Sequence, residues 1–137
     1  MSNLSESQDY TEIVRPEWAD CNNHMNVAFY VLIFDHGTDA LLESIGMNLA
    51  HRESTGSSVF VAEAHVTYDN EVMVGETVRI QSQVIDYDEK RLHLMHQMFK
   101  ADGELAATNE LMILHVNLNT RKACAFPKNI LSEITPI

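Results

Sequence analysis

The sequence predicts an α+β domain in which a curved antiparallel sheet of five or six strands wraps around one long helix. Three observations favour this class. Residues 27–45 form an apolar stretch that is too long for a strand and has helix-capping residues at both ends. Runs of alternating apolar and polar residues follow from residue 59 onwards. Turn signals such as Asp102-Gly103 separate neighbouring runs, which is typical of antiparallel hairpins.

The charge balance bears on location and on the partners of the protein. The chain has 137 residues, with nine Lys and Arg against 20 Asp and Glu and a formal net charge of -11. Nucleic-acid binders and proteins that adsorb to anionic membranes need basic surfaces, so both classes are disfavoured. No apolar run approaches the roughly 20 residues of a membrane-spanning helix, and the first ten residues resemble no signal or transit peptide. We therefore expect a cytoplasmic protein.

The first predicted elements are a short strand and the long helix, and both belong to one domain. The polar residues 1–9 are expected to be a flexible tail, and residues 10–137 a single domain. Residues 10–14 can form a strand that ends before Pro16. Asn26 is the expected N-cap of the helix, and Gly46 falls where a left-handed C-terminal cap would lie.

The remaining strands are expected after a polar loop at residues 51–58. They cover residues 59–68, 77–86, 91–100 and 105–119, and a sixth short strand around residues 122–125 is the alternative to five. In the strand at 59–68, alternation puts five residues on one face: Phe60, Ala62, Ala64, Val66 and Tyr68. Such a sheet leaves a strand edge unpaired in a monomer, so we expect a homodimer or a dimer of dimers.

Four polar residues precede the apolar helix at every second position: Asp20, Asn22, His24 and Asn26. Asp and Asn are favoured in turns, so this segment has a purely structural interpretation as a turn and a cap. The functional interpretation places a substrate carbonyl at the helix N-terminus, where free amides and the helix dipole stabilise an oxyanion. A nearby carboxylate could then activate water or attack directly.

Glu63 is a second candidate for this chemistry. It interrupts an otherwise apolar run, and a buried carboxylate is costly unless it has a partner. The alternative is an outward-facing Glu on a half-exposed strand, with His65 two residues further along on the same face.

The sequence holds no pattern that predicts a metal or redox cofactor. The seven histidines are scattered, the two cysteines do not have metal-site spacing, and no phosphate-binding or dinucleotide-binding motif is present. We therefore expect no cofactor and no metal ligands.

The segment Asp20-x-Asn22-x-His24-Met25-Asn26-x-x-x-Tyr30 resembles the D-x-N-x-H-x-N segment of hotdog-fold acyl-CoA thioesterases, in the 4-hydroxybenzoyl-CoA thioesterase-like superfamily. The resemblance implies a hotdog fold, hydrolysis of an acyl-CoA, and four catalytic residues: Asp20, Asn22, His24 and Glu63. Asp20 and Glu63 stay alternatives for the base. The segment Asn22-Asn23-His24 departs from the Asn-Gly-His expected of the family, with Asn23 in place of glycine. Asn tolerates left-handed geometry better than most residues.

A closer resemblance covers about residues 17–127 and rests on four segments: Glu17-Trp18, Thr38-Asp39-Ala40-Leu41-Leu42, Lys90-Arg91-Leu92-His93 and Leu114-His115-Val116. These segments are similar to betainyl-CoA thioesterases of carnitine breakdown. This resemblance implies betainyl-CoA as the substrate, with Trp18, Asn26, Phe29 and Tyr30 as candidate binding residues. Aromatic faces suit a trimethylammonium group, although core packing is the alternative for these rings. Two alternative functions are a non-catalytic acyl-CoA-binding module and a thioesterase for aliphatic or aromatic acyl groups.

Overall fold

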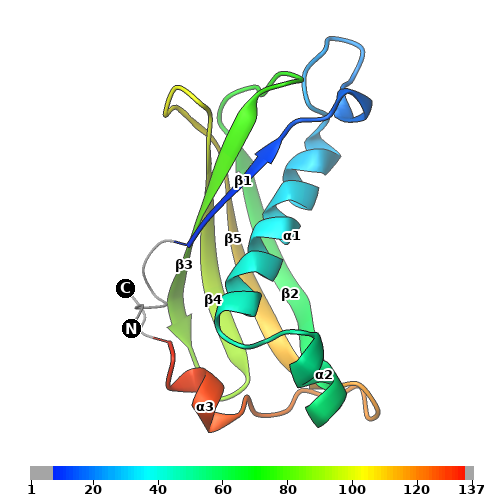
Figure 1. The fold of residues 1–137 in the computed structure, drawn as a ribbon, viewed down its shortest axis with the longest axis vertical. Helices are drawn as coiled ribbons and strands as arrows, with labels where there is room; N and C mark the ends of the chain where they lie inside the picture. Colours follow the sequence, from blue (N-terminus) through cyan, green and yellow to red (C-terminus); the bar gives the residue numbers. More distant parts are fainter. Residues whose placement is uncertain (1–7, 135–137) are drawn as a thin grey trace.

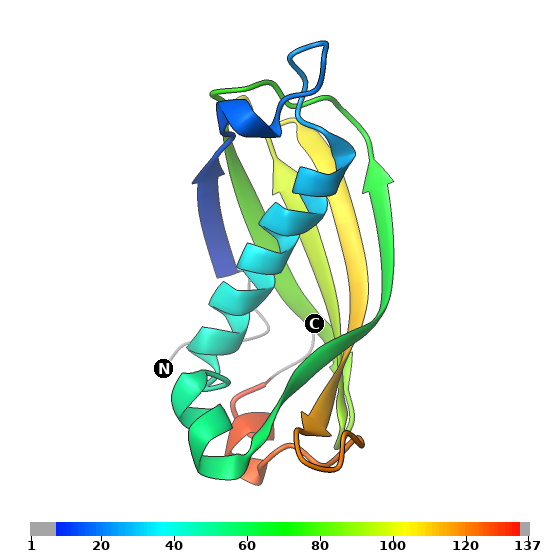
Figure 2. The same ribbon diagram turned by 90° about the vertical axis from the view of Figure 1, so that its right-hand side faces the viewer.

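The computed structural model describes residues 8–134, and the sheet in it curls around one long helix (Figure 1, Figure 2). The helix is α1 (Val27–Ser44). The strands lie in the order β1-β3-β4-β5-β2, and all neighbours pair antiparallel. Their bounds are β1 (Gln8–Ile13), β2 (Ser57–Tyr68), β3 (Thr77–Tyr87), β4 (Arg91–Phe99) and β5 (Leu105–Asn117). The predicted α+β hotdog architecture is therefore confirmed, with five strands in the described residues.

The predicted caps set the limits of α1. The Asn26 side chain accepts a hydrogen bond from the Ala28 amide at 3.0 Å, as an N-cap does. Gly46 follows the helix with φ of +88°, the left-handed conformation that glycine adopts without strain. Phe34, Ile33 and Leu41 are fully buried on the helix.

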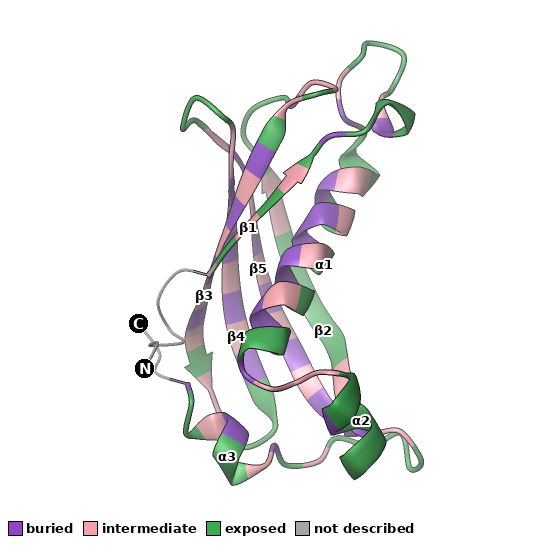
Figure 3. Ribbon diagram, viewed as in Figure 1, coloured by how far each residue is buried: buried purple, intermediate pink, exposed green. Residues whose placement is uncertain are grey.

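The core lies between α1 and the concave face of the sheet. Burial alternates along β3 and β4, so every second side chain of these strands faces the helix (Figure 3). The buried residues form two clusters, one around the first half of α1 and one around its second half. This packing holds the start of α1, and the loop before it, at one end of the molecule.

The expected alternation of β2 is wrong, because the strand has a bulge. The register with β5 shifts between Val61 and Glu63, so Ala62 is the extra residue. Val61 pairs with the buried Ile113, and Ala64 with the buried Leu111. Since directly paired residues share a face, the bulge moves Ala64, Val66 and Tyr68 to the face that Val59 and Val61 occupy. Phe60 lies on the opposite face.

Three further expectations at element boundaries need correction. The expected polar loop at 51–58 holds a helix, α2 (Leu49–Thr55), capped by Asn48 and by Gly56 with φ of +70°. The possible strand at 122–125 is only an isolated bridge between Val116 and Ala123. The first strand begins at Gln8, two residues inside the expected tail, and residues 1–7 lie outside the described range.

The remaining elements are short. A 3-10 turn, η1 (Pro16–Trp18), follows β1, and a final helical turn, α3 (Lys128–Leu131), closes the other end of the molecule. In the described range, no helix has the length and hydropathy needed to cross a membrane.

Candidate active site

The polar segment before α1 forms a tight hairpin loop. Asp20 donates its amide proton to the His24 carbonyl at 2.8 Å, and Asn23 donates to the Asp20 carbonyl at 3.1 Å. Asn23 has φ of +64°, so it occupies the left-handed position that ends a three-residue hairpin loop. Asn23 therefore adopts left-handed geometry, which glycine would also allow at this position.

The Asp20 side chain organises this loop through one of its two oxygens. Oδ1 accepts from the Asn22 amide at 2.9 Å and from the His24 amide at 3.2 Å. No other described residue forms a hydrogen bond with Oδ2. The residue is exposed, as is Asn22. One carboxylate oxygen is thus held by the backbone, while the other remains open to solvent or to a ligand.

His24 has a partner that the sequence pattern did not reveal. Its Nε2 atom lies 2.9 Å from Oε2 of Glu71, a residue in the loop between β2 and β3. The two residues are 47 positions apart in the sequence, so no local spacing links them. The only local signal is a carboxylate beside the apolar run that starts at Val72, and this signal is equally common on ordinary loops.

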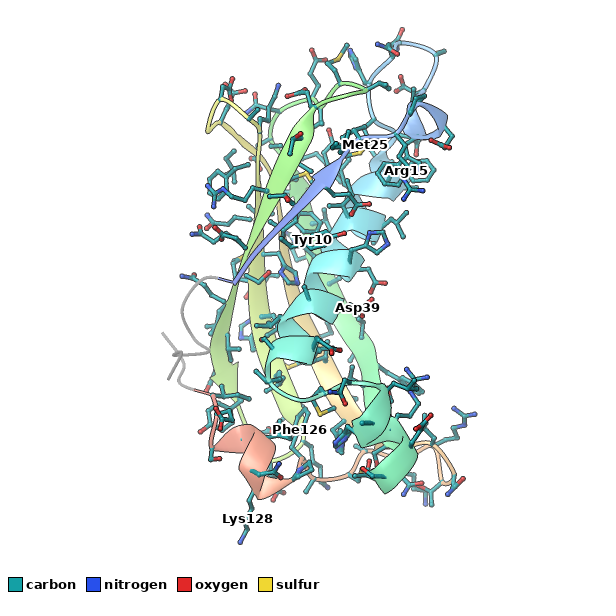
Figure 4. The ribbon with its side chains drawn as sticks, in the orientation of Figure 1. Tyr10, Arg15, Met25, Asp39, Phe126 and Lys128 are labelled. Atoms are coloured by element: carbon teal, nitrogen blue, oxygen red, sulfur yellow. The ribbon has the colours of Figure 1, made fainter. Side chains whose placement is uncertain are left out.

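The loop lies directly against the start of α1 (Figure 4), close to the labelled Met25. Met25 is buried and donates its amide proton to the Val72 carbonyl at 2.7 Å. In the first turn of the helix, the Ala28 amide donates a hydrogen bond to the Asn26 side chain, and the Phe29 amide donates to the Asn26 carbonyl. The Val27 amide has no hydrogen bond to another described residue, and Val27 is itself an exposed residue.

The candidate aromatic residues pack mainly into the core. Trp18 is 5% exposed and stacks on Phe29 with ring centroids 5.5 Å apart. The Arg15 guanidinium already covers the Trp18 ring at 5.2 Å from its centroid. The Tyr30 hydroxyl accepts from the Val72 amide at 3.1 Å, and burial raises the pKa of this hydroxyl. Phe29 is the most accessible of the three rings, and a binding role for all of them stays a prediction.

Glu63 is not brought to the Asp20 loop within one chain. It is exposed on β2, beside the bulge, and is paired across the sheet with Met112. Its surroundings are His65, His93 and Glu110, of which His93 Nε2 and Glu110 Oε2 are 2.6 Å apart. Because Met112 lies between the buried Leu111 and Ile113, this group occupies the sheet face that points away from α1. A catalytic role for Glu63 stays a prediction.

A further pair of histidines is buried away from the loop. His51 and His115 face each other with Nε2 atoms 3.0 Å apart, and His115 stacks on Phe126 at the opposite end of the molecule from Met25 (Figure 4). Burial lowers the pKa of both imidazoles. Within residues 8–134, no three His, Cys, Asp or Glu side chains are placed so that they could hold a metal ion.

The sequence and the fold are both similar to those of known proteins. The thioesterase-like superfamily matches residues 14–134 of the chain. The chain is similar to a Staphylococcus aureus protein solved in complex with CoA, at a TM-score of 0.90 and 35% identity over 97% of this chain and 84% of that one.

Two curated relatives are named for betainyl-CoA. A betainyl-CoA thioesterase of Pseudomonas aeruginosa is 36% identical over 91% of this chain and 79% of its own length. An L-carnitine dehydrogenase/betainyl-CoA thioesterase of Ruegeria pomeroyi is 39% identical over 80% of this chain, which spans only 22% of that longer protein. The chain therefore belongs to the thioesterase-like superfamily and is a thioester hydrolase.

Proposed function

We propose that the protein hydrolyses acyl-CoA thioesters at the Asp20 loop and that its substrate is betainyl-CoA, which is converted to betaine and CoA. The observation that carries the site assignment is the placement of the Asp20 carboxylate. One oxygen is fixed by two backbone amides, and the other is open beside the N-terminus of α1. A carboxylate held in this way is ready to accept a proton without reorganising.

The reaction needs a water molecule, a base and donors for the oxyanion. The thioester carbonyl lies at the start of α1, where the Val27 amide and the helix dipole stabilise the negative oxygen. Asp20 takes a proton from the water that attacks the carbonyl carbon. The tetrahedral intermediate collapses with cleavage of the carbon–sulfur bond, and the CoA thiolate takes up the proton. Direct attack by Asp20 is the alternative, and neither route uses a metal or redox cofactor.

Asn22 and His24 are assigned to positioning the water and the thioester. Asn22 is exposed at the tip of the loop, and His24 is half-buried at its base. We assign His24 to the thioester group and Asn22 to the part of the substrate that enters from solvent. Asn26 holds the start of the helix in place through its cap.

Betainyl-CoA is supported by the named relatives and by charge. A quaternary ammonium is attracted to aromatic faces and to negative charge, and the chain carries a net charge of -11. The exposed part of Phe29 and the acidic loop residues offer both. Because Arg15 already covers Trp18, we assign recognition of the ammonium to negative charge rather than to an aromatic cage.

We also propose that the protein pairs through β2 as a homodimer or a dimer of dimers and acts in the cytoplasm. The outer edge of β2 pairs with no other described strand, and its exposed apolar residues include Phe60, Val61 and Tyr68. Addition of the same strand from a second copy would satisfy the backbone groups and cover these side chains.

Release of free thiol from a panel of CoA thioesters tests the function. Betainyl-CoA is compared with acetyl-CoA, a long-chain acyl-CoA and an aromatic acyl-CoA, using wild type, Asp20→Asn and Glu63→Gln. We expect preference for betainyl-CoA and a fall in kcat of about 100-fold or more in Asp20→Asn. Retained activity in Glu63→Gln would leave Asp20 as the base, whereas a loss in both variants would keep both carboxylates in the mechanism.

The other outcomes separate the alternatives. Preference for a different acyl group would keep the thioesterase and reject betainyl-CoA. Binding of acyl-CoA without thiol release would favour the non-catalytic binding module. Full activity in Asp20→Asn together with loss of activity in Glu63→Gln would identify Glu63 as the general base.

A further inference from the structure

We propose that Glu71 is a positioning residue for His24, which it holds in one ring orientation and one tautomer. The proposal rests on the function proposed above, because His24 is assigned to the substrate there. It adds to the site a carboxylate that lies outside the Asp20–Asn26 segment.

The contact is direct and charge-assisted. Glu71 Oε2 lies 2.9 Å from His24 Nε2, while the exposed fractions of the two side chains are 59% and 36%. A carboxylate at this position accepts only, so Nε2 must carry the proton. Nδ1 of the neutral ring is then the acceptor, ready to take a proton or a hydrogen bond from water or substrate.

The backbone around Glu71 is held in place on both sides. The Glu71 carbonyl accepts a hydrogen bond from Lys100 Nζ at 2.9 Å, and the Val72 amide donates to the Tyr30 hydroxyl. The Val72 carbonyl also accepts from the Met25 amide at 2.7 Å, next to His24. Because Tyr30 and Val72 are buried, this anchor ties the Glu71 loop to the first turn of α1.

His24 is therefore fixed by two carboxylates that act on different parts of the residue. Asp20 Oδ1 binds its backbone amide, and Glu71 binds its ring. An isolated bridge to Met73 aligns its backbone with the Glu71 loop. Without Glu71, the backbone would still be held, but the ring would be free to rotate and to change tautomer.

Two other charged side chains near this contact, Glu76 and Lys100, have partners of their own. Glu76 Oε2 accepts from the Met73 amide at 2.7 Å and lies 3.7 Å from Lys100 Nζ. Lys100 thus contacts the backbone oxygen of Glu71 and the carboxylate of Glu76. Among the described residues, it is Glu71 that places an acidic side chain against the His24 ring.

A double-mutant cycle tests the proposal. The variants Glu71→Gln, His24→Asn and the double variant are compared with wild type for kcat, KM and melting temperature. We expect Glu71→Gln to lower kcat about 10-fold with little change in KM. In the His24→Asn background the same substitution should have no further effect, because its target is gone. Equal losses in both backgrounds would overturn the proposal and make Glu71 a structural residue.

Two controls complete the experiment. Glu71→Asp retains the charge and should recover part of the lost kcat. Glu89→Gln removes one exposed negative charge from the turn between β3 and β4, and should leave kcat unchanged. A similar fall in kcat for Glu89→Gln would point to net charge and overturn the positioning role.

A spectroscopic measurement keeps this test independent of turnover. The ¹⁵N shifts of the neutral His24 ring report which nitrogen carries the proton. We expect the Nε2-protonated tautomer in wild type and a mixture in Glu71→Gln. If no acyl-CoA is hydrolysed but the tautomer responds in this way, the proposed function fails and the Glu71–His24 coupling stands. An unchanged tautomer would overturn the coupling even in an active enzyme.

Discussion

His96 Nε2 donates a hydrogen bond to Thr38 Oγ1 at 2.7 Å and so joins the middle of β4 to the middle of α1. The Thr38 hydroxyl donates onward to the Phe34 carbonyl, which makes its oxygen the acceptor from the imidazole. On the other side of the ring, Ser82 Oγ lies 2.6 Å from Nδ1 and donates to it. The neutral ring is thus fully hydrogen-bonded although it is completely buried.

This arrangement predicts a specific loss of stability in acid. Burial lowers the pKa of His96 from 6.5 to about 4. Between these values the unfolded chain binds a proton that the folded chain does not, so the free energy of unfolding falls as the pH falls through this window. The contribution is about 3 kcal/mol on going from pH 7 to pH 4. Urea unfolding of wild type and His96→Gln at both pH values measures it.

The expected result is a smaller acid-induced loss in His96→Gln, even though the variant is less stable at neutral pH. His51 and His115 also have lowered pKa values, but they are present in both proteins and cancel in the difference. The same acid-induced loss in both proteins would show that His96 titrates normally in the folded chain.

Gly37 predicts a second, steric effect at the same helix–sheet contact. A Cβ added at Gly37 would lie 2.9 Å from Cγ2 of Ile80, a fully buried residue of β3. Gly37→Ala should therefore destabilise the fold by about 1–3 kcal/mol, despite the better helix propensity of Ala. Thermal unfolding measures the change, and the cost should shrink in an Ile80→Ala background, where the clash is absent. A stabilised Gly37→Ala protein would contradict the close approach of α1 and β3.

The parts of the fold that could be predicted from the sequence are those encoded in local patterns. Asn26 and Gly46 limit α1 as expected, because cap residues act within one turn of their own position. The turn at Asp102-Gly103 also forms where expected, with Gly103 at φ of +91°. Such signals require no knowledge of the rest of the chain.

The features that were missed depend on contacts between distant segments. The residues of α2 show no apolar periodicity. Its buried residue is His51, which reaches His115 on β5. The bulge in β2 shifts the register by a single small residue, Ala62, which leaves no mark in the alternation pattern. Glu71 meets His24 because the loop between β2 and β3 pairs with the segment before α1.

Asn23 predicts a difference between substitutions in the candidate active site. Because its φ is +64°, glycine should fit this position at least as well, whereas a β-branched residue should be strained. We expect Asn23→Gly to retain the turnover of wild type, and Asn23→Val to lower kcat because Asp20 and His24 are no longer held together. Thiol release is measured beside the melting temperature, since the exposed loop should affect activity more than stability. Equal activity in the two variants would show that the loop conformation does not matter for the reaction.

The unpaired edge of β2 predicts the oligomeric state and how it can be disrupted. Val61 is 55% exposed next to the bulge, where a second copy of β2 would cover it. A lysine at this position should block the pairing, because a buried, unpaired ammonium costs more free energy than the apolar contact provides. We expect wild type to have at least the mass of a dimer in light scattering and Val61→Lys to be a folded monomer.

Val31→Lys, a substitution at an exposed apolar site on α1, is the matched control and tests whether the helix face takes part. A monomeric wild type would reject pairing through β2, and a dimer that persists in Val61→Lys but is lost in Val31→Lys would move the interface to α1.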